Sequence, residues 1–164
     1  MQTWIIRLTL LLCMAIGITA GIGSRTPVEA QDEPYPGSIE ISLGDRGTVV
    51  ARAMVQIPVT LTCTMPSVPW ETGPFGTNAS ITVRISQAAG RNIVNGEMPL
   101  YGLEPICDGT PQSLVVEIIG DAPFKGGQAV VSAYGGVSFV AWEPQYVELG
   151  ASDSTGNQVI RLGG

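Results

Sequence analysis

The side chains able to do chemistry in this chain are carboxylates and cysteines, because the sequence contains no histidine. Without histidine there is no Ser-His-Asp or Cys-His arrangement and no histidine-bound metal. Two carboxylates across a cleft can still hydrolyse a glycosidic bond, and Glu97, Glu104 and Asp108 are the candidates. Their spacing does not distinguish them from ordinary turn acids. We therefore expect no enzyme activity, no metal site and no cofactor, with a carboxylate-only hydrolase as an alternative.

The cysteines predict one structural disulfide. Of the three in the chain, Cys13 lies in an apolar N-terminal run, which leaves Cys63 and Cys107. An even number of thiols in an exported chain is typical of a disulfide. A redox-active pair would have a Cys-x-x-Cys spacing, which is absent. Bridging Cys63 to Cys107 closes a loop of roughly 45 residues, for which chain entropy gives about 4 kcal/mol of stabilisation.

Residues 1–30 have the pattern of a secretory signal peptide. Arg7 precedes an apolar run over residues 8–18, which is shorter than the roughly 20 residues of a membrane span. Small residues suit cleavage after Ala20 or after Ala30, and we favour Ala30. We expect a secreted or cell-surface protein that does not contact the membrane after cleavage. An uncleaved N-terminal anchor is the alternative.

The charge of the chain after the signal peptide excludes some partners. Residues 1–30 hold Arg7, Arg25 and Glu29, so residues 31–164 hold six basic and thirteen acidic residues, a net charge of −7. The basic residues form no run in the sequence. Nucleic-acid grooves and anionic membranes need clustered Lys and Arg. We expect neither as a partner, and we expect an extracellular protein or a cell-surface glycan instead.

Alternation of apolar and polar residues predicts β-strands almost throughout. Residues 48–63 alternate over their whole length, as in a half-buried strand, and we expect a bend or a break near Pro58 because proline cannot donate to a ladder. Residues 39–43 alternate too, and Gly44-Asp45-Arg46-Gly47 is typical of a hairpin turn.

Further strands follow at regular intervals. Residues 81–86 and 114–119 alternate, and two more strands, 127–134 and 137–142, are predicted to meet in a hairpin at Gly135-Gly136. One or two closing strands are expected at residues 145–149 and 157–162. The pattern indicates one all-β domain over residues 38–162, with seven to nine short strands, preceded by a flexible segment over residues 31–37.

The order of these features resembles a group of small secreted bacterial proteins with an immunoglobulin-like sandwich and no assigned activity. The resemblance covers roughly residues 38–162 and implies an antiparallel β-sandwich without catalytic residues. No tryptophan follows Cys63 in the next strand and no Tyr-x-Cys corner precedes Cys107, so only the architecture is implied. The motifs that carry it are Leu61-Thr62-Cys63, residues 83–87, Cys107-Asp108-Gly109-Thr110, residues 114–118, and Phe124-Lys125-Gly126-Gly127-Gln128-Ala129.

The connection over residues 64–78 is the candidate binding loop. It is long for a compact domain and rich in Pro and Gly, and it carries Trp70 and Phe75. Stiff aromatic side chains can anchor a protein partner or stack on a sugar; alternatively, the two fold back and cap the sandwich. Tyr134, Trp142 and Tyr146 are interpreted as sheet-surface or core residues.

We favour a secreted, non-catalytic interaction module that uses this loop. A carrier of a small apolar ligand between the sheets is an alternative, similar in kind to the chromophore-carrying sandwiches that actinobacteria secrete. That family has two disulfides, whereas this chain has cysteines for one after the signal peptide.

Overall fold

The computed structural model describes residues 35–68 and 72–164. The expected signal peptide and Trp70 lie outside the described residues. Within the two ranges the regular structure is all β, as expected, and no helix there is long and apolar enough to cross a membrane. The strands are β1 (Ser38–Leu43), β2 (Arg46–Ala51), β3 (Met54–Thr64), β4 (Gly76–Ala89), β5 (Asn92–Leu103), β6 (Gln112–Ile119), β7 (Gly127–Ala141), β8 (Val147–Ser154) and β9 (Gln158–Gly163).

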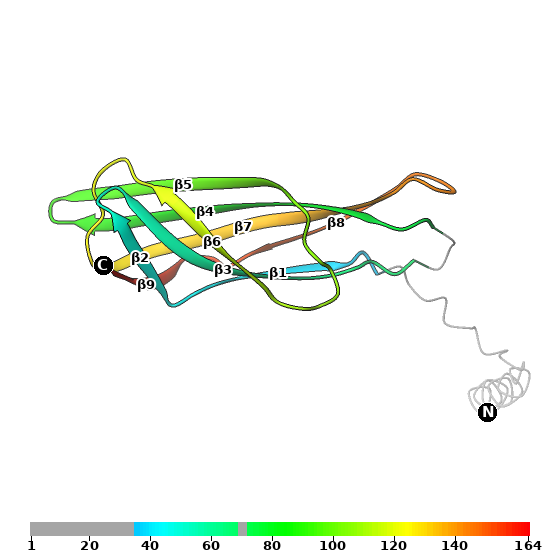
Figure 1. Ribbon diagram of the computed structural model, residues 1–164, viewed down its shortest axis with the longest axis horizontal. Helices are drawn as coiled ribbons and strands as arrows, with labels where there is room; N and C mark the ends of the chain where they lie inside the picture. Colours follow the sequence, from blue (N-terminus) through cyan, green and yellow to red (C-terminus); the bar gives the residue numbers. More distant parts are fainter. Residues whose placement is uncertain (1–34, 69–71) are drawn as a thin grey trace, which may run out of the picture. The chain divides into compact units, whose positions relative to one another are not determined.

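The nine strands of the described ranges form one mixed sheet. Hydrogen-bonded neighbours follow the order β1-β3-β2-β9-β7-β4-β5, while β6 also pairs with β3 and β8 also pairs with β7. All pairs are antiparallel except β2–β9, which runs parallel. In Figure 1, β2, β9 and the C-terminus lie at one end of the domain, and the loops after β3 and β7 lie at the other.

The sheet folds over on itself around a single apolar core. Every second residue of β3 from Val55 to Cys63 is buried, and so are inward residues of β4, β6, β7 and β9. Phe139 of β7 is the bulkiest of the fully buried side chains. Because burying one such side chain contributes about 1.5–3 kcal/mol, this alternation explains why the segments become strands.

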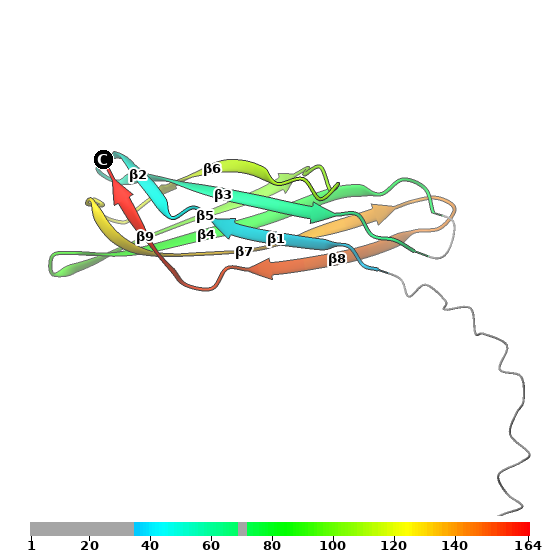
Figure 2. The same cartoon turned by 90° about the horizontal axis from the view of Figure 1, so that it is seen from below.

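At two places, edge strands of the folded sheet lie beside each other without forming a ladder, and we call these places seams. At each seam an aspartate carboxylate accepts a hydrogen bond from a backbone N–H of the facing strand. At the first seam β1 lies beside β8 (Figure 2), and the Ile41 N–H donates to Oδ2 of Asp153 on β8 at 2.7 Å. At the second, between β5 and β6, the Asn95 N–H donates to Oδ1 of Asp121 at 2.9 Å. The carboxylates satisfy edge donors that no strand reaches.

The predicted hairpin at residues 44–47 is wrong. Both β1 and β2 pair with the same edge of β3, so the chain bends after Leu43 and runs on in the same direction. The reversal comes later, at Arg52 and Ala53. Gly44 is needed at the bend because a Cβ there would lie 2.5 Å from Cγ of Pro58.

The predicted break near Pro58 is also wrong, since Pro58 lies inside β3. Its carbonyl accepts from the Gly44 N–H at 2.9 Å. In an antiparallel strand the N–H and C=O of one residue point to the same side. The donor that proline lacks would therefore point at the bend between β1 and β2, where the ladder is interrupted anyway.

The third correction concerns Gly135-Gly136, which lie inside the continuous strand β7. Neither glycine has a positive φ. A Cβ on Gly135 would lie 2.3 Å from the carbonyl oxygen of Ser80 on β4, and one on Gly136 would lie 3.0 Å from that of Ala151 on β8. The two glycines allow close approach of neighbouring strands rather than a turn.

Candidate functional site

The disulfide between Cys63 and Cys107 is present and fastens the end of β3 to the β5–β6 connection. Its Cα atoms are 4.5 Å apart and both residues are buried. Backbone bonds surround it: the Gly109 N–H donates to the Cys63 carbonyl at 2.9 Å, and the Met65 N–H donates to the Cys107 carbonyl at 3.1 Å. The β5–β6 connection is thereby held against the end of β3, where the connection to β4 begins.

That connection covers residues 65–75, so the binding loop predicted over residues 64–78 is shorter than expected, because Thr64 ends β3 and β4 begins at Gly76. Trp70 lies outside the described residues, so its role as an anchor stays a prediction. Phe75 is half-buried and packs against the core beside β4. Ser67 exchanges two backbone hydrogen bonds with Tyr35, at 2.8 and 2.9 Å, which ties the loop to the segment before β1.

An exposed aromatic pair lies on the neighbouring β7–β8 loop. Trp142 is 74% exposed and Tyr146 is 54% exposed, and their ring centroids are 5.1 Å apart with an interplanar angle of 57°. Strand β7 ends at Ala141 and β8 begins at Val147. The two rings therefore belong to the loop, and their interpretation as sheet-surface or core residues is wrong.

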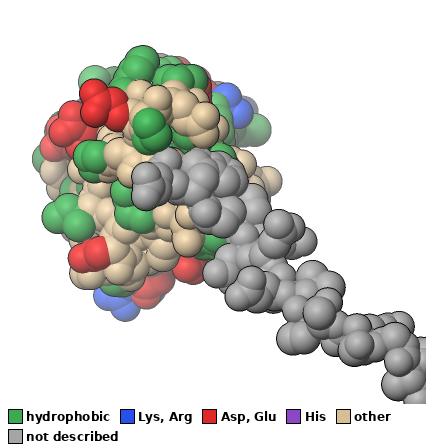
Figure 3. Space-filling view, turned by 90° about the vertical axis from the view of Figure 1, so that its right-hand side faces the viewer, with side chains coloured by type: hydrophobic (Ala, Val, Ile, Leu, Met, Phe, Trp, Pro, Cys, Tyr) green, Lys and Arg blue, Asp and Glu red, His purple; other side chains and the backbone are tan. Residues whose placement is uncertain are grey.

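The described parts of the two loops meet and form one surface, which we call the aromatic end: residues 65–68, 72–75 and 142–146 together with Tyr35. The Gly73 N–H donates to the Glu143 carbonyl across the loops. Figure 3 views the domain from this side and shows hydrophobic side chains toward the middle, with acidic and basic side chains at the rim. None of the described residues in these two loops is Lys or Arg.

Hydrogen bonds orient two of the tyrosines. The Tyr146 hydroxyl donates to the Glu148 carboxylate, which raises the pKa of Tyr146. Hydrogen bonds with Ser38 and then Thr64 lower the pKa of Tyr35, whose hydroxyl lies 3.1 Å from Oγ1 of Thr64. The rings are thus held by polar contacts at their tips while their faces stay open to solvent.

The candidate catalytic carboxylates are divided between strand β5 and the connection that follows it. Glu97 lies on β5 and pairs with Arg84 of β4 at 2.9 Å. Asp108 and Glu104 lie in the β5–β6 connection. The backbone N–H of Thr110 donates to Asp108 at 2.8 Å and lowers its pKa. A general acid needs the opposite shift, so this arrangement gives a hydrolase no support.

The hollows among the described residues are open surface features. One of about 530 Å³ is lined by Arg84, Asn95, Glu97 and Asp121 with their neighbours. Another of about 360 Å³ has a floor of glycines and serines over β4, β7 and β8. Neither is an enclosed apolar cavity between the two halves of the sheet, which a carrier of a small apolar ligand requires.

Comparison with known proteins does not assign this chain to a family. No protein-family model matches the chain, and no curated protein sequence matches it. Among solved structures it is similar to Spo0M, a sporulation control protein from Bacillus subtilis, at 11% sequence identity and a TM-score of 0.27. The match covers 78% of this chain and 49% of that one, so the chain spans about half the length of Spo0M. A TM-score this low carries no argument about function.

Sequence reasoning missed the Trp142–Tyr146 pair for an identifiable reason. The segment Trp142-Glu143-Pro144-Gln145-Tyr146 has aromatics four apart around a proline. Each ring borders an alternating stretch, and both were therefore assigned to strands. Pro144 was the available signal, because proline favours a turn over a central strand.

Proposed function

We propose that this protein is a secreted, non-catalytic binding module with an immunoglobulin-like sandwich, and that its aromatic end binds a neutral cell-surface glycan. The observation that carries the proposal is the exposed pair of Trp142 and Tyr146. Stiff rings lose little conformational entropy on binding, and their faces suit the apolar face of a sugar. The disulfide supports an oxidising location outside the cytosol.

The chemistry around the pair favours a sugar over a charged ligand. Glu143 and Glu148 flank the rings and accept hydrogen bonds from hydroxyl groups. The described loop residues carry no cation that would attract an anionic partner. Protein hot spots combine Trp and Tyr with Arg, and Arg is missing from this surface.

Strand pairing supports the immunoglobulin-like part of the proposal. In that fold strand A pairs with B, B with E, C with F, and F with G. The same partners are obtained when β1, β3 and β6 are taken as A, B and E, and β4, β7 and β9 as C, F and G. β5 then extends the second group beside β4, as an additional strand does in variable-type domains.

The test is binding of the purified domain to isolated cell-wall glycans and to a panel of neutral oligosaccharides. Trp142→Ala is expected to weaken binding about 30-fold, since a hot-spot truncation costs about 2 kcal/mol or more. Its melting temperature should change little, because a side chain that is 74% exposed makes few packing contacts.

The control is Tyr101→Ala, which removes another aromatic side chain, 76% exposed, from β5. It should bind like the wild type. If both variants bind glycans as the wild type does, the aromatic end is not the site. If the wild type binds no glycan but captures a surface protein through Trp142, the glycan part of the proposal is refuted.

A further inference from the structure

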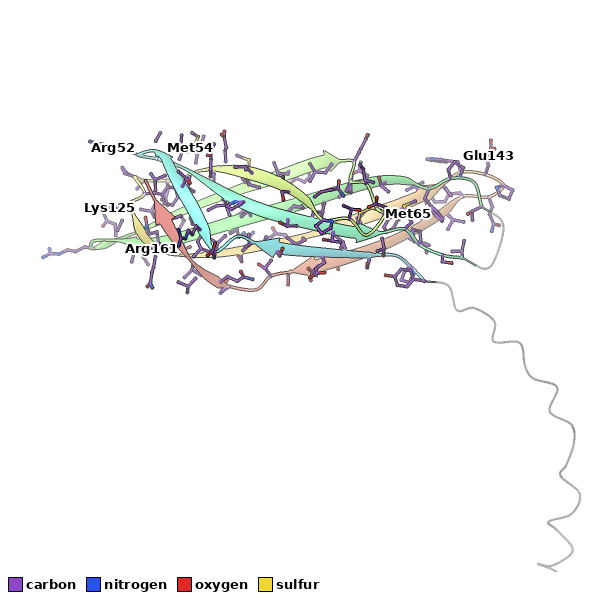
Figure 4. All side chains as sticks on the ribbon, turned by 60° about the horizontal axis from the view of Figure 1, so that its bottom comes forward. Arg52, Met54, Met65, Lys125, Glu143 and Arg161 are labelled. Atoms are coloured by element: carbon purple, nitrogen blue, oxygen red, sulfur yellow. A yellow bond between two sulfur atoms is a disulfide. The ribbon has the colours of Figure 1, made fainter. Side chains whose placement is uncertain are left out.

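The fold gathers basic side chains that the sequence scatters. Figure 4 labels Arg52, Lys125 and Arg161 at one end of the domain, opposite Met65 and Glu143. The Phe124 N–H donates to the Arg52 carbonyl, which fixes the β6–β7 loop beside the β2–β3 turn. The absence of a basic run in the sequence therefore does not mean the absence of a basic surface.

Two arginines at this end lie directly side by side, and we call Arg46 and Arg161 the arginine pair. They are register partners in the parallel ladder of β2 and β9, so their Cα atoms are about 4.8 Å apart and their side chains point to the same face. Both are exposed. Like charges in such a position repel each other.

The described residues do not neutralise this pair. The ion pair that the described residues form joins Arg84 to Glu97, which lie on strands β4 and β5 and not on β2 or β9. The neighbour of Arg161 on β7 is the uncharged Gln128. The acid that comes nearest along the chain is Asp45, whose carbonyl accepts from the Arg161 N–H and which shares an adjacent hollow with Arg161.

A hollow of about 260 Å³ opens between the two arginines. Its remaining lining is Gly47, Thr48 and Gly163. Thr48 and Gly163 are the register partners two positions beyond the arginine pair. The glycine leaves the floor open, while Thr48 supplies a hydroxyl. Each guanidinium offers five N–H donors in a planar fork that matches oxyanions such as phosphate.

We propose that the arginine pair and this hollow form a binding site for a phosphate or sulfate group. Two guanidinium groups and the Thr48 hydroxyl surround the oxyanion, and the hollow leaves room for part of the molecule that carries it. The site lies at the opposite end from Trp142 and Tyr146 and does not depend on the glycan proposal. Either can fail without the other.

The experiment is an NMR titration of the folded domain at constant ionic strength, with inorganic phosphate and then inorganic sulfate as probes. The amide signals of Gly47, Thr48 and Gly163 should shift and saturate. Arg46→Gln/Arg161→Gln should weaken binding at least tenfold, and Arg161→Gln alone should weaken it less. Asp45→Asn should tighten binding, because it removes the adjacent negative charge.

Arg91→Gln is the matched control, since Arg91 is an exposed arginine on the β4–β5 turn. It should bind like the wild type. Phosphate should also raise the melting temperature of the wild type and not that of the double variant. Saturation by one anion alone assigns the site to that anion. Shifts spread over all basic residues, or equal binding by the double variant, would overturn the site.

Discussion

Replacing Gly135 by alanine tests whether strands β4 and β7 approach each other as closely as the structure shows. The added Cβ would lie 2.3 Å from the Ser80 carbonyl oxygen and 3.0 Å from the Ile81 Cα. Both contacts are with backbone, so no side chain can rotate away. Strands β4 and β7 would have to separate by about 1 Å to restore a normal contact. Overpacking of this kind costs about 3 kcal/mol, a large share of the 5–15 kcal/mol that stabilises a domain.

Gly150→Ala is the matched control for this substitution. It adds the same methyl group to the adjacent strand β8, where the nearest atom is the Val137 carbonyl oxygen at 3.6 Å. That distance is an ordinary contact. Because alanine loses less backbone entropy than glycine on folding, this variant should be unchanged or more stable by about 0.5–1 kcal/mol.

Urea unfolding followed by far-UV circular dichroism measures both variants. The free energy of unfolding should fall by about 3 kcal/mol for Gly135→Ala at an unchanged m-value. A loss of less than about 1 kcal/mol would refute the reasoning, because overpacking against a backbone carbonyl costs more than that.

Two further substitutions test the disulfide and the first seam. Cys63→Ala/Cys107→Ala removes a cross-link over a separation of 44 residues and should lower the free energy of unfolding by about 4 kcal/mol; equal urea midpoints for the double variant and the oxidised wild type would contradict this. Asp153→Ala leaves the Ile41 N–H without its acceptor and should cost about 1–3 kcal/mol. Asp153→Asn keeps an acceptor oxygen and should cost less, and faster hydrogen exchange at Ile41 in the alanine variant is the direct readout.

Alternation in the sequence was sufficient to identify most strands. Inward positions of β3, and those of β4 from Ala79 to Ile85 and of β6 from Leu114 to Ile118, are apolar at every second residue, because each strand has one face on the core. β5 was missed. Val94, Met98 and Leu100 on its inward side alternate with exposed residues, but Gly96 and Pro99 interrupt the apolar–polar pattern, and among its residues only Val94 is fully buried.

The wrong predictions concern residues whose conformation depends on a contact with a residue that is distant in the sequence. Gly135 carries the same local signal as a turn glycine, and only the Ser80 carbonyl beside it explains its place in β7. Pro58 is tolerated because the side of β3 on which it lacks an N–H donor faces the bend at Gly44. Neither contact can be recognised from the neighbouring residues in the sequence, which therefore predicted a turn at Gly135 and a break near Pro58.

The same limit applies to the two candidate sites. Cys63 and Cys107 were identified from their number alone, whereas Trp142 and Tyr146 required knowledge of where β7 ends. Arg46 and Arg161 are far apart in the chain, and the parallel pairing that brings them together involves only three residues of each strand. A ladder that short leaves no periodic signal in the sequence.

The two seams also affect what copies of this chain can do to one another. The open edges of a sheet are where a second molecule adds a strand, and repeated addition gives fibres. Asp153 and Asp121 already occupy the Ile41 and Asn95 donors and leave a negative charge beside each edge. An incoming strand would have to displace a carboxylate from each of these donors. Addition of a strand at either position would therefore cost the hydrogen bond that the donor already makes to a carboxylate.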